Sequence, residues 1–220
     1  MGKLTLLNAL VLLLAGNALA DVVASQSGPD NDNWSLDNGQ TLAVSWTSSS
    51  DTYSNVTIDV TLNGASGEGD TVQAYLTDLI GTGATSGNVL ATNTFVYTAG
   101  SQDETFTAFS GLTLDPGTYY LVLYDPGASG NWWGSDTAAT QTTAPGVTIA
   151  SDEFANQGDL DTTNPYASTF HAFALGLHFT VTGDVESGET SPVPEPSSLV
   201  GLGALFAGVV GFKIRRALKA

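Results

Sequence analysis

The stretch His171-Ala-Phe-Ala-Leu-Gly-Leu-His-Phe-Thr-Val-Thr182 is the most regular alternating segment of the chain. Successive side chains of a strand point to opposite faces of its sheet, so this period of two predicts one long β-strand with an apolar face. That face would carry His171, Phe173, Leu175, Leu177, Phe179 and Val181. A long closing strand of this kind fits an all-β fold, and we predict an antiparallel β-sandwich or jelly-roll-like ectodomain.

Shorter alternating segments lie upstream of this stretch, and no long part of residues 21–182 shows a helical period. They predict strands at residues 41–46, 56–62, 71–77, 89–97 and 119–124. The last of these is apolar on both faces, which indicates a central strand. Before it, Asp115-Pro116-Gly117 is typical of a turn in which proline fixes φ and glycine takes a positive φ. The polar segment 136–165 lacks periodicity and predicts an extended loop over the sandwich.

The N-terminal residues 1–20 have the three parts of a secretory signal peptide. Lys3 supplies a positive charge, residues 4–15 are largely apolar, and Ala18-Leu19-Ala20 is a small-residue cleavage site. An uncleaved anchor or a buried helix would share the apolar run, but the three features together favour cleavage before Asp21. We therefore expect an exported ectodomain at 21–182, followed by an acidic linker at 183–192.

The C-terminal residues 193–220 read as a sorting signal with a membrane segment. Val193-Pro194-Glu195-Pro196 should be a rigid, extended segment because proline fixes φ, and residues 199–212 carry no charge. This run is short for a span, but a snorkelling Lys213 extends the predicted membrane helix to 199–214. The basic stop consists of Lys213, Arg215 and Arg216, and it would hold the C-terminus in the cytoplasm.

This tail resembles the PEP-CTERM sorting signal of Gram-negative bacteria, in which a Pro-Glu-Pro motif precedes an apolar helix and an arginine cluster. The resemblance implies recognition by an exosortase-type membrane protease, transient inner-membrane anchoring and cleavage near Pro194-Glu195-Pro196. It also implies delivery to the cell surface or to an exopolysaccharide-rich biofilm matrix. Separately, residues 111–124 (GLTLDPGTYYLVLY) weakly resemble bacterial pre-peptidase-type β-sandwich domains.

The charge of the chain is divided sharply between its parts. All 5 lysine and arginine residues lie at position 3 or beyond position 212, whereas all 22 acidic residues lie between Asp21 and Glu195. The exported region therefore has no basic side chain with which to bind phosphate, which excludes nucleic acid as a partner. The acidity can serve solubility alone or Ca²⁺-mediated contact with acidic polysaccharide. The chain has no cysteine, which removes thiol catalysis and zinc–thiolate sites.

Two acidic clusters are candidate Ca²⁺ sites. The first is Asp30, Asp32 and Asp37, but Ser35 stands where an EF-hand loop needs glycine, and an Asx-turn loop explains the pattern as well. The second and weaker cluster consists of Asp152, Glu153, Asp159 and Asp161. Beyond a possible Ca²⁺, the sequence predicts no cofactor.

An aromatic pair, Trp132-Trp133, is a candidate platform for an extracellular polysaccharide, although adjacent strand residues face opposite ways and one ring should be core. His171 and His178 would lie on opposite faces, the first at the core edge and the second on the surface. No G-x-S-x-G or H-E-x-x-H motif supports catalysis. We predict a non-enzymatic structural or adhesive matrix protein, with a polysaccharide- or Ca²⁺-binding module as the alternative. A hydrolase would require an acid pair or a Ser/His constellation in a cleft.

Overall fold

The computed structural model describes residues 20–29, 32–36, 39–64, 71–96, 104–127, 130–136, 139–150 and 152–186. Within these ranges the chain is all-β, and its only helical elements are two short 3₁₀ turns, Ser86–Asn88 and Pro165–Ala167. No helix among the described residues is long and apolar enough to cross a membrane. The compact unit that contains them ends at Glu186.

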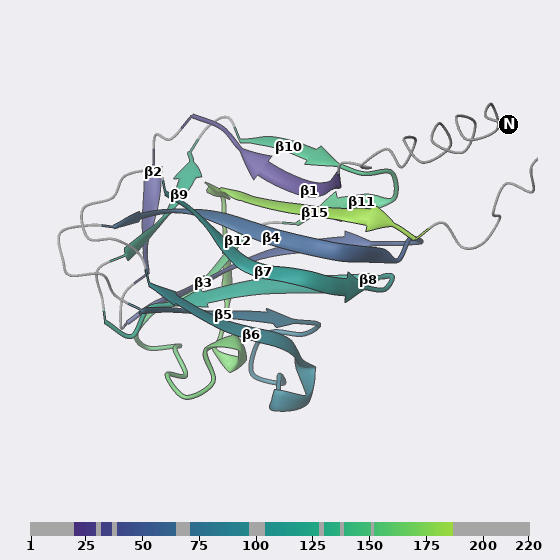
Figure 1. The fold of residues 1–220 in the computed structure, drawn as a ribbon. Coiled ribbons are helices and arrows are strands. Elements are labelled where there is room, and N and C mark those ends of the chain that lie inside the picture. Colours follow the sequence, from purple (N-terminus) through teal and green to yellow (C-terminus); the bar gives the residue numbers. More distant parts are fainter. Residues whose placement is uncertain are drawn as a thin grey trace, which may run out of the picture. The chain divides into compact units, whose positions relative to one another are not determined.

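The strands form two antiparallel sheets that pack against each other (Figure 1). The first sheet contains β1 (Asp21–Ser27), β2 (Asp32–Leu36), β4 (Tyr53–Gly64), β7 (Glu104–Leu114), β9 (Gly130–Ser135), β10 (Thr140–Thr143), β14 (Gly176–Leu177) and β15 (Phe179–Val185). The second contains β3 (Thr41–Ser48), β5 (Thr71–Thr77), β6 (Val89–Val96), β8 (Gly117–Tyr124), β11 (Val147–Ile149), β12 (Asp152–Ala155) and β13 (His171–Phe173). The predicted all-β fold with two antiparallel sheets is confirmed.

Eight of these strands form the framework. In the first sheet β1, β15, β4 and β7 lie side by side in that order, and in the second β3, β8, β5 and β6 do. We call them the eight central strands. The other strands, apart from β2, belong to the long connection between β8 and β15, which we call the β8–β15 segment (residues 125–178).

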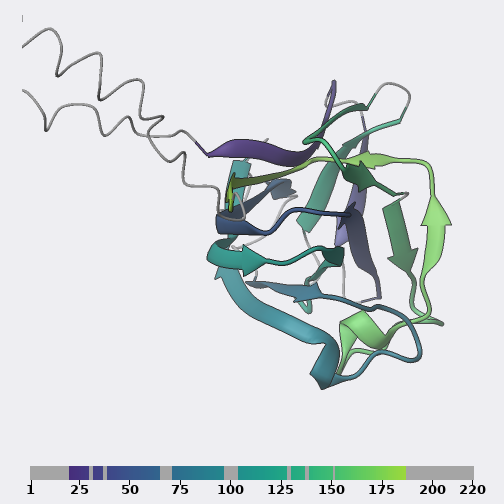
Figure 2. The same cartoon turned by 90° about the vertical axis from the view of Figure 1, so that its right-hand side faces the viewer.

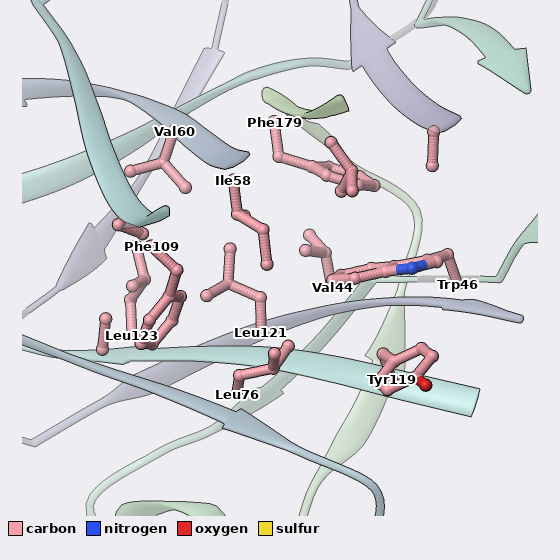
Figure 3. Close-up of a cluster of buried hydrophobic side chains, with 14 of the residues drawn as sticks. Val44, Trp46, Ile58, Val60, Leu76, Phe109, Tyr119, Leu121, Leu123 and Phe179 are labelled. Atoms are coloured by element: carbon pink, nitrogen blue, oxygen red, sulfur yellow. The ribbon is translucent and has the colours of Figure 1, made fainter. Parts of the chain in front are cut away.

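The core lies between the central strands of the two sheets (Figure 3). Trp46 of β3 is fully buried, and its ring stacks on Tyr119 at 5.8 Å and on Phe179 at 5.9 Å between ring centroids. Because Phe179 belongs to the first sheet, this stack joins the two layers. Aliphatic side chains fill the space around it, among them Ile58 and Leu121. Close packing of such groups is the main stabilising contribution in a sandwich.

The five strands predicted upstream of residue 125 are confirmed as β3, β4, β5, β6 and β8, with small shifts at their ends. The central position of β8 is confirmed too, since β3 and β5 flank it. The turn at Asp115-Pro116 exists, but it carries the chain from β7 of the first sheet to β8 of the second. Gly117 already belongs to β8 and is not among the described residues with positive φ, so that detail of the turn was wrong.

The prediction of one strand over 171–182 was wrong. The chain forms β13 in the second sheet, then crosses to the first sheet as β14 and β15 (Figure 2). A backbone bond from Leu177 N to Leu175 O, 3.1 Å long, marks the crossing. From Leu175 to Val181 the odd-numbered residues are all buried, but His178 between them is buried too, so the predicted alternation is incomplete there.

Two further expectations are corrected. The segment 136–165 is not an extended loop, since it contains β10, β11 and β12. These strands have three or four residues each, too few for a period to stand out in the sequence. The closing strand also continues to Val185, so residues 183–185 belong to the sandwich and not to the predicted linker.

Both ends of the described chain lie at the same end of the sandwich. Asp21 opens β1 and pairs with Gly183 of β15, two residues before that strand ends. The two strands lie side by side in Figure 1. Gln26 and Phe179 form the last pair of these two strands, toward the opposite end. A strand rises about 3.4 Å per residue, so Gln26 lies roughly 17 Å from Asp21.

Candidate functional site

A buried polar cluster occupies the end of the sandwich opposite Asp21. Four of its side chains are almost inaccessible: Gln26 of β1 is 3% exposed, Ser135 of β9 is 2%, Asp152 of β12 is 3% and His178 is 6%. Three belong to the β8–β15 segment, and Gln26 is contributed by a central strand. Buried polar groups are costly unless hydrogen-bonded, so their partners decide what the cluster does.

Asp152 links the two sheets through its carboxyl group. Gln26 Nε2 donates to both carboxyl oxygens at 3.1 Å, and the backbone N–H of Leu177 donates to Oδ2 at 2.8 Å. Gln26 Nε2 also donates to the Leu177 carbonyl at 3.1 Å. Gln26 Oε1 accepts a 2.7 Å bond from Gln141 of β10. The network thus connects β12 of the second sheet with β1, β10 and β14 of the first.

Burial dominates the ionisation of Asp152. Loss of hydration raises the pKa of this carboxyl from 3.8 to about 7, against the opposing effects of the Leu177 N–H and the Gln26 amide. No lysine or arginine occurs between residues 20 and 186, so no such cation offsets the burial. A carboxyl group that is half-ionised near neutral pH and lines a cavity is typical of a functional site.

A cavity of about 300 Å³ opens beside this carboxyl. We call it the Asp152 cavity. It is lined by Gln26, Ser135, Asp136, Ala139, Gln141, Ala150, Asp152 and residues 173–176. The crossing between the sheets forms one wall, so the break in the alternating stretch creates the cavity.

Two glycines allow the crossing segment to pack closely against its neighbours, Gly134 on β9 and Gly176 on the crossing segment itself. A Cβ on Gly134 would lie 2.9 Å from Leu175 Cγ, and a Cβ on Gly176 would lie 2.1 Å from Ala139 Cβ. Real Cβ atoms do not approach so closely, so a side chain at either position would force the wall to move. The glycines therefore explain how the sequence can bring these segments together.

Ser135 and His178 form a second polar contact in the same cluster. Ser135 Oγ lies 2.9 Å from His178 Nε2, and it also donates to the carbonyl of Pro29 at 2.8 Å. A nucleophilic serine must give its proton to the histidine, whereas here the hydroxyl donates to a backbone carbonyl. This geometry ties β9 to Pro29, which follows β1, and to His178, which lies between β14 and β15.

The two histidines occupy the reverse of their predicted positions. His178 is buried, whereas the His171 side chain is 50% exposed and contacts Asp159 at 3.1 Å. The crossing between β13 and β15 interrupts the alternation on which the prediction depended. The backbone N–H of His178 now pairs with the Trp133 carbonyl at 2.8 Å, which turns its ring toward Ser135.

The second predicted Ca²⁺ cluster does not converge. Asp152 points into the sandwich, Asp159 meets His171, and Asp161 accepts bonds from the backbone N–H groups of Thr163 and Asn164. Glu153 is half-buried, and burial raises its pKa. Among the described residues, no three His, Cys, Asp or Glu side chains are placed to hold a metal ion.

The first predicted Ca²⁺ cluster is described only in part. Asp30 and Asp37 lie outside the described residues. Asp32 opens β2, and its Oδ1 accepts a 2.8 Å bond from the backbone N–H of Asn33. This bond reaches only the next residue, whereas an Asx-turn bond reaches two residues on, so it does not decide between the two alternatives.

The two tryptophans of the predicted aromatic platform lie on opposite faces of β9, as adjacent residues of a strand must. Trp132 is fully buried, and its indole N–H donates to the His178 carbonyl at 2.9 Å, so no sugar can stack on it. The assignment of Trp132 to a sugar site is therefore corrected. Trp133 is half-buried on the opposite face of β9, and it remains a candidate.

The predicted sorting residues lie outside the described residues: Val193, Pro194, Glu195, Pro196, Lys213, Arg215 and Arg216. Ala18 does so too, whereas Ala20 is exposed directly before β1. No protein-family model matches this chain, and no curated protein is significantly similar to it. Its function is therefore inferred from its own residues.

Sequence reasoning missed Gln26, Ser135 and Gln141. A weak sequence signal pointed to Gln26. It lies two residues after Ala24, on the same buried face of β1, and yet it is polar. A polar residue on the apolar face of a strand indicates a buried partner. Ser135 and Gln141 gave no signal, since they stand among many serine, threonine and glutamine residues in segment 125–178.

Proposed function

We propose that this chain is an exported, non-enzymatic structural or adhesive protein of the extracellular matrix, sorted there by its C-terminal residues 193–220. The observation that carries this proposal is the division of charge. Every lysine and arginine lies in the two predicted processing signals, so their removal would leave an entirely acidic sandwich. Such a domain repels its own copies and stays soluble during export.

The placement of the chain ends supports the same proposal. Asp21 and Val185 belong to neighbouring strands and lie at one end of the sandwich. The Asp152 cavity lies toward the other end of these strands, where Gln26 lines it, away from the residues at which the two predicted signals join the sandwich.

We also assign the sandwich to the jelly-roll class. The order β1-β15-β4-β7 in one sheet and β3-β8-β5-β6 in the other supports this, since each neighbour relation matches that of an eight-strand double Greek key. The β8–β15 segment would then be an elaboration of the last connection of the roll. The class alone does not define an activity.

The test of sorting is mass spectrometry of the extracellular protein from a host that has an exosortase. We expect the mature chain to begin at Asp21 and to end near Pro194–Ser198. Replacement of Pro194, Glu195 and Pro196 by alanine should retain the tail, whereas the neighbouring Ser191→Ala change should not. A secreted chain that keeps Arg215 and Arg216 would refute the sorting function.

A second candidate function is binding of polysaccharide, and the Asp152 cavity favours it. The cavity offers carboxyl, amide and hydroxyl groups beside an aromatic side chain, which is the composition of a small-ligand site. The Ca²⁺-binding alternative has no comparable support within the described residues.

A further inference from the structure

The Asp152 cavity has a lining of defined chemistry. Its polar groups are the carboxyls of Asp136 and Asp152, the amides of Gln26 and Gln141, and the Ser135 hydroxyl. Its apolar wall includes Phe173 and Leu175. Phe173 is held in place by the Trp34 ring, whose centroid lies 5.0 Å away. A rigid apolar wall facing hydrogen-bonding groups is suited to a ligand with one apolar face and polar edges.

The hydrogen-bonding capacity of this lining is incompletely used. Among the described residues two donor groups, Gln26 Nε2 and Leu177 N, bond to the Asp152 carboxyl, whereas a carboxylate accepts about four hydrogen bonds. Gln141 is exposed at the rim, and its amide uses one N–H on Gln26. The cavity therefore offers an acceptor at its floor and a donor and an acceptor at its mouth.

The charges of the lining restrict the ligand. Two carboxyl groups and the absence of lysine or arginine from residues 20–186 disfavour phosphates and uronic acids. The polar floor disfavours a purely apolar ligand, because the carboxyl would lose hydration without a partner. A neutral ring that carries hydroxyl groups meets both conditions, since hydroxyls donate to carboxylates and exchange bonds with amides.

We propose that the Asp152 cavity binds one neutral sugar unit, whose hydroxyls contact Asp152 and Gln141 and whose C–H face packs on Phe173. This inference rests on the second candidate function and names its ligand class. A volume of about 300 Å³ lies at the lower limit of small-ligand pockets and suits a single pyranose ring. A donated sugar hydroxyl would also stabilise the ionised Asp152, so binding should strengthen as pH rises through neutrality.

The test is ligand-observed NMR on the full chain, purified in a detergent without a sugar headgroup. The probes are the neutral methyl glycosides of glucose, galactose, mannose and N-acetylglucosamine at millimolar concentration, together with glucuronate and CaCl₂. We expect at least one neutral glycoside to bind and glucuronate to bind more weakly. Because the purified chain is used, the result does not depend on whether the tail is processed.

The matched variants are Gln141→Ala at the rim of the cavity and Gln157→Ala in an exposed loop outside it. Loss of one hydrogen-bonded partner should weaken the glycoside about fivefold to tenfold in Gln141→Ala and leave Gln157→Ala unchanged. Both side chains are exposed, but Gln141→Ala also removes the donor to Gln26 Oε1, so urea unfolding of both variants checks that they are folded. Asp152→Asn should weaken binding and remove its pH dependence.

Three results would overturn the proposal. The first is that no neutral glycoside binds at millimolar concentration. The second is binding that Gln141→Ala does not weaken, which would place the sugar elsewhere, for example at Trp133. The third is binding of Ca²⁺ or glucuronate at the cavity in preference to every neutral glycoside.

Discussion

The eight central strands bury aromatic and aliphatic side chains between the sheets, whereas the β8–β15 segment buries a carboxyl group among amides. In the first region the Trp46 side chain stacks on the rings of Tyr119 and Phe179. In the second, Asp152 joins the sheets through Gln26 and Leu177. The stabilisation from ring packing does not depend on pH, whereas the contribution of a buried carboxyl group to stability does. The two regions should therefore respond to different perturbations.

The largest expected effect is on the apolar region. Trp46→Ala should lower the free energy of unfolding by about 3–5 kcal/mol, because it removes a fully buried ring and leaves a cavity between the sheets. Urea unfolding followed by circular dichroism measures it. The control is Leu90→Ala in β6, whose side chain is 49% exposed, and it should change stability by less than about 0.5 kcal/mol. Equal losses in the two variants would contradict the assignment of the core.

The same contrast explains what the sequence could predict. A period of two predicts five of the eight central strands, β3, β4, β5, β6 and β8, with ends that differ from the observed ones by up to three residues. The other long strands β1 and β7 were not predicted. The β8–β15 segment uses strands of two to six residues, where tertiary contacts and not local pattern decide the structure. The crossing at Leu175–Leu177 also depends on Gly134 and Gly176, whose role appears only once Gly134 is seen to lie against Leu175 and Gly176 against Ala139.

The sequence identified one residue of the candidate site, Asp152, but not the residues that surround it. Asp152 was recognised as a site residue, but as a Ca²⁺ ligand beside Asp159 and Asp161, since sequence proximity was the only guide. The structure instead pairs it with Gln26, which is 126 positions away in the chain. Contacts of such separation follow from the pairing of β1 with β15 and of β12 with β3, and no local pattern encodes them.

The second prediction concerns the pH dependence of the polar region. The folded-state pKa of Asp152 is about 7 and its ordinary value is 3.8, so the folded protein holds this proton more tightly than the unfolded chain. The resulting stabilisation is complete below pH about 4 and is lost as pH rises through 7. It is on the order of 4 kcal/mol at most. Asp152→Asn should remove this part of the decline in urea-unfolding profiles from pH 4 to 8.

The difference between the two profiles isolates Asp152, since repulsion among the many other acids also grows with pH. Asp161→Asn is the control in the same segment. Backbone N–H groups of Asn164 and Thr163 lower the pKa of Asp161, so its stabilising effect is lost only as pH falls below the ordinary range. This variant should keep the decline between pH 4 and 7. Parallel profiles for wild type and Asp152→Asn would mean that the carboxyl is hydrated in solution.

The smallest expected effect is that of Asp159→Asn. It tests whether the burial of Asp152, and not its polarity alone, sets the β8–β15 segment apart from the central strands. Asp159 and His171 also form a polar contact in the β8–β15 segment, but their side chains are 33% and 50% exposed. Water solvates both groups in the folded and unfolded chain, so Asp159→Asn should change the free energy of unfolding by less than about 0.5 kcal/mol. A loss well above that value, measured by urea unfolding at neutral pH, would show that exposed polar contacts also stabilise this segment. A small effect would leave the desolvation of Asp152 as the property that distinguishes this end of the sandwich.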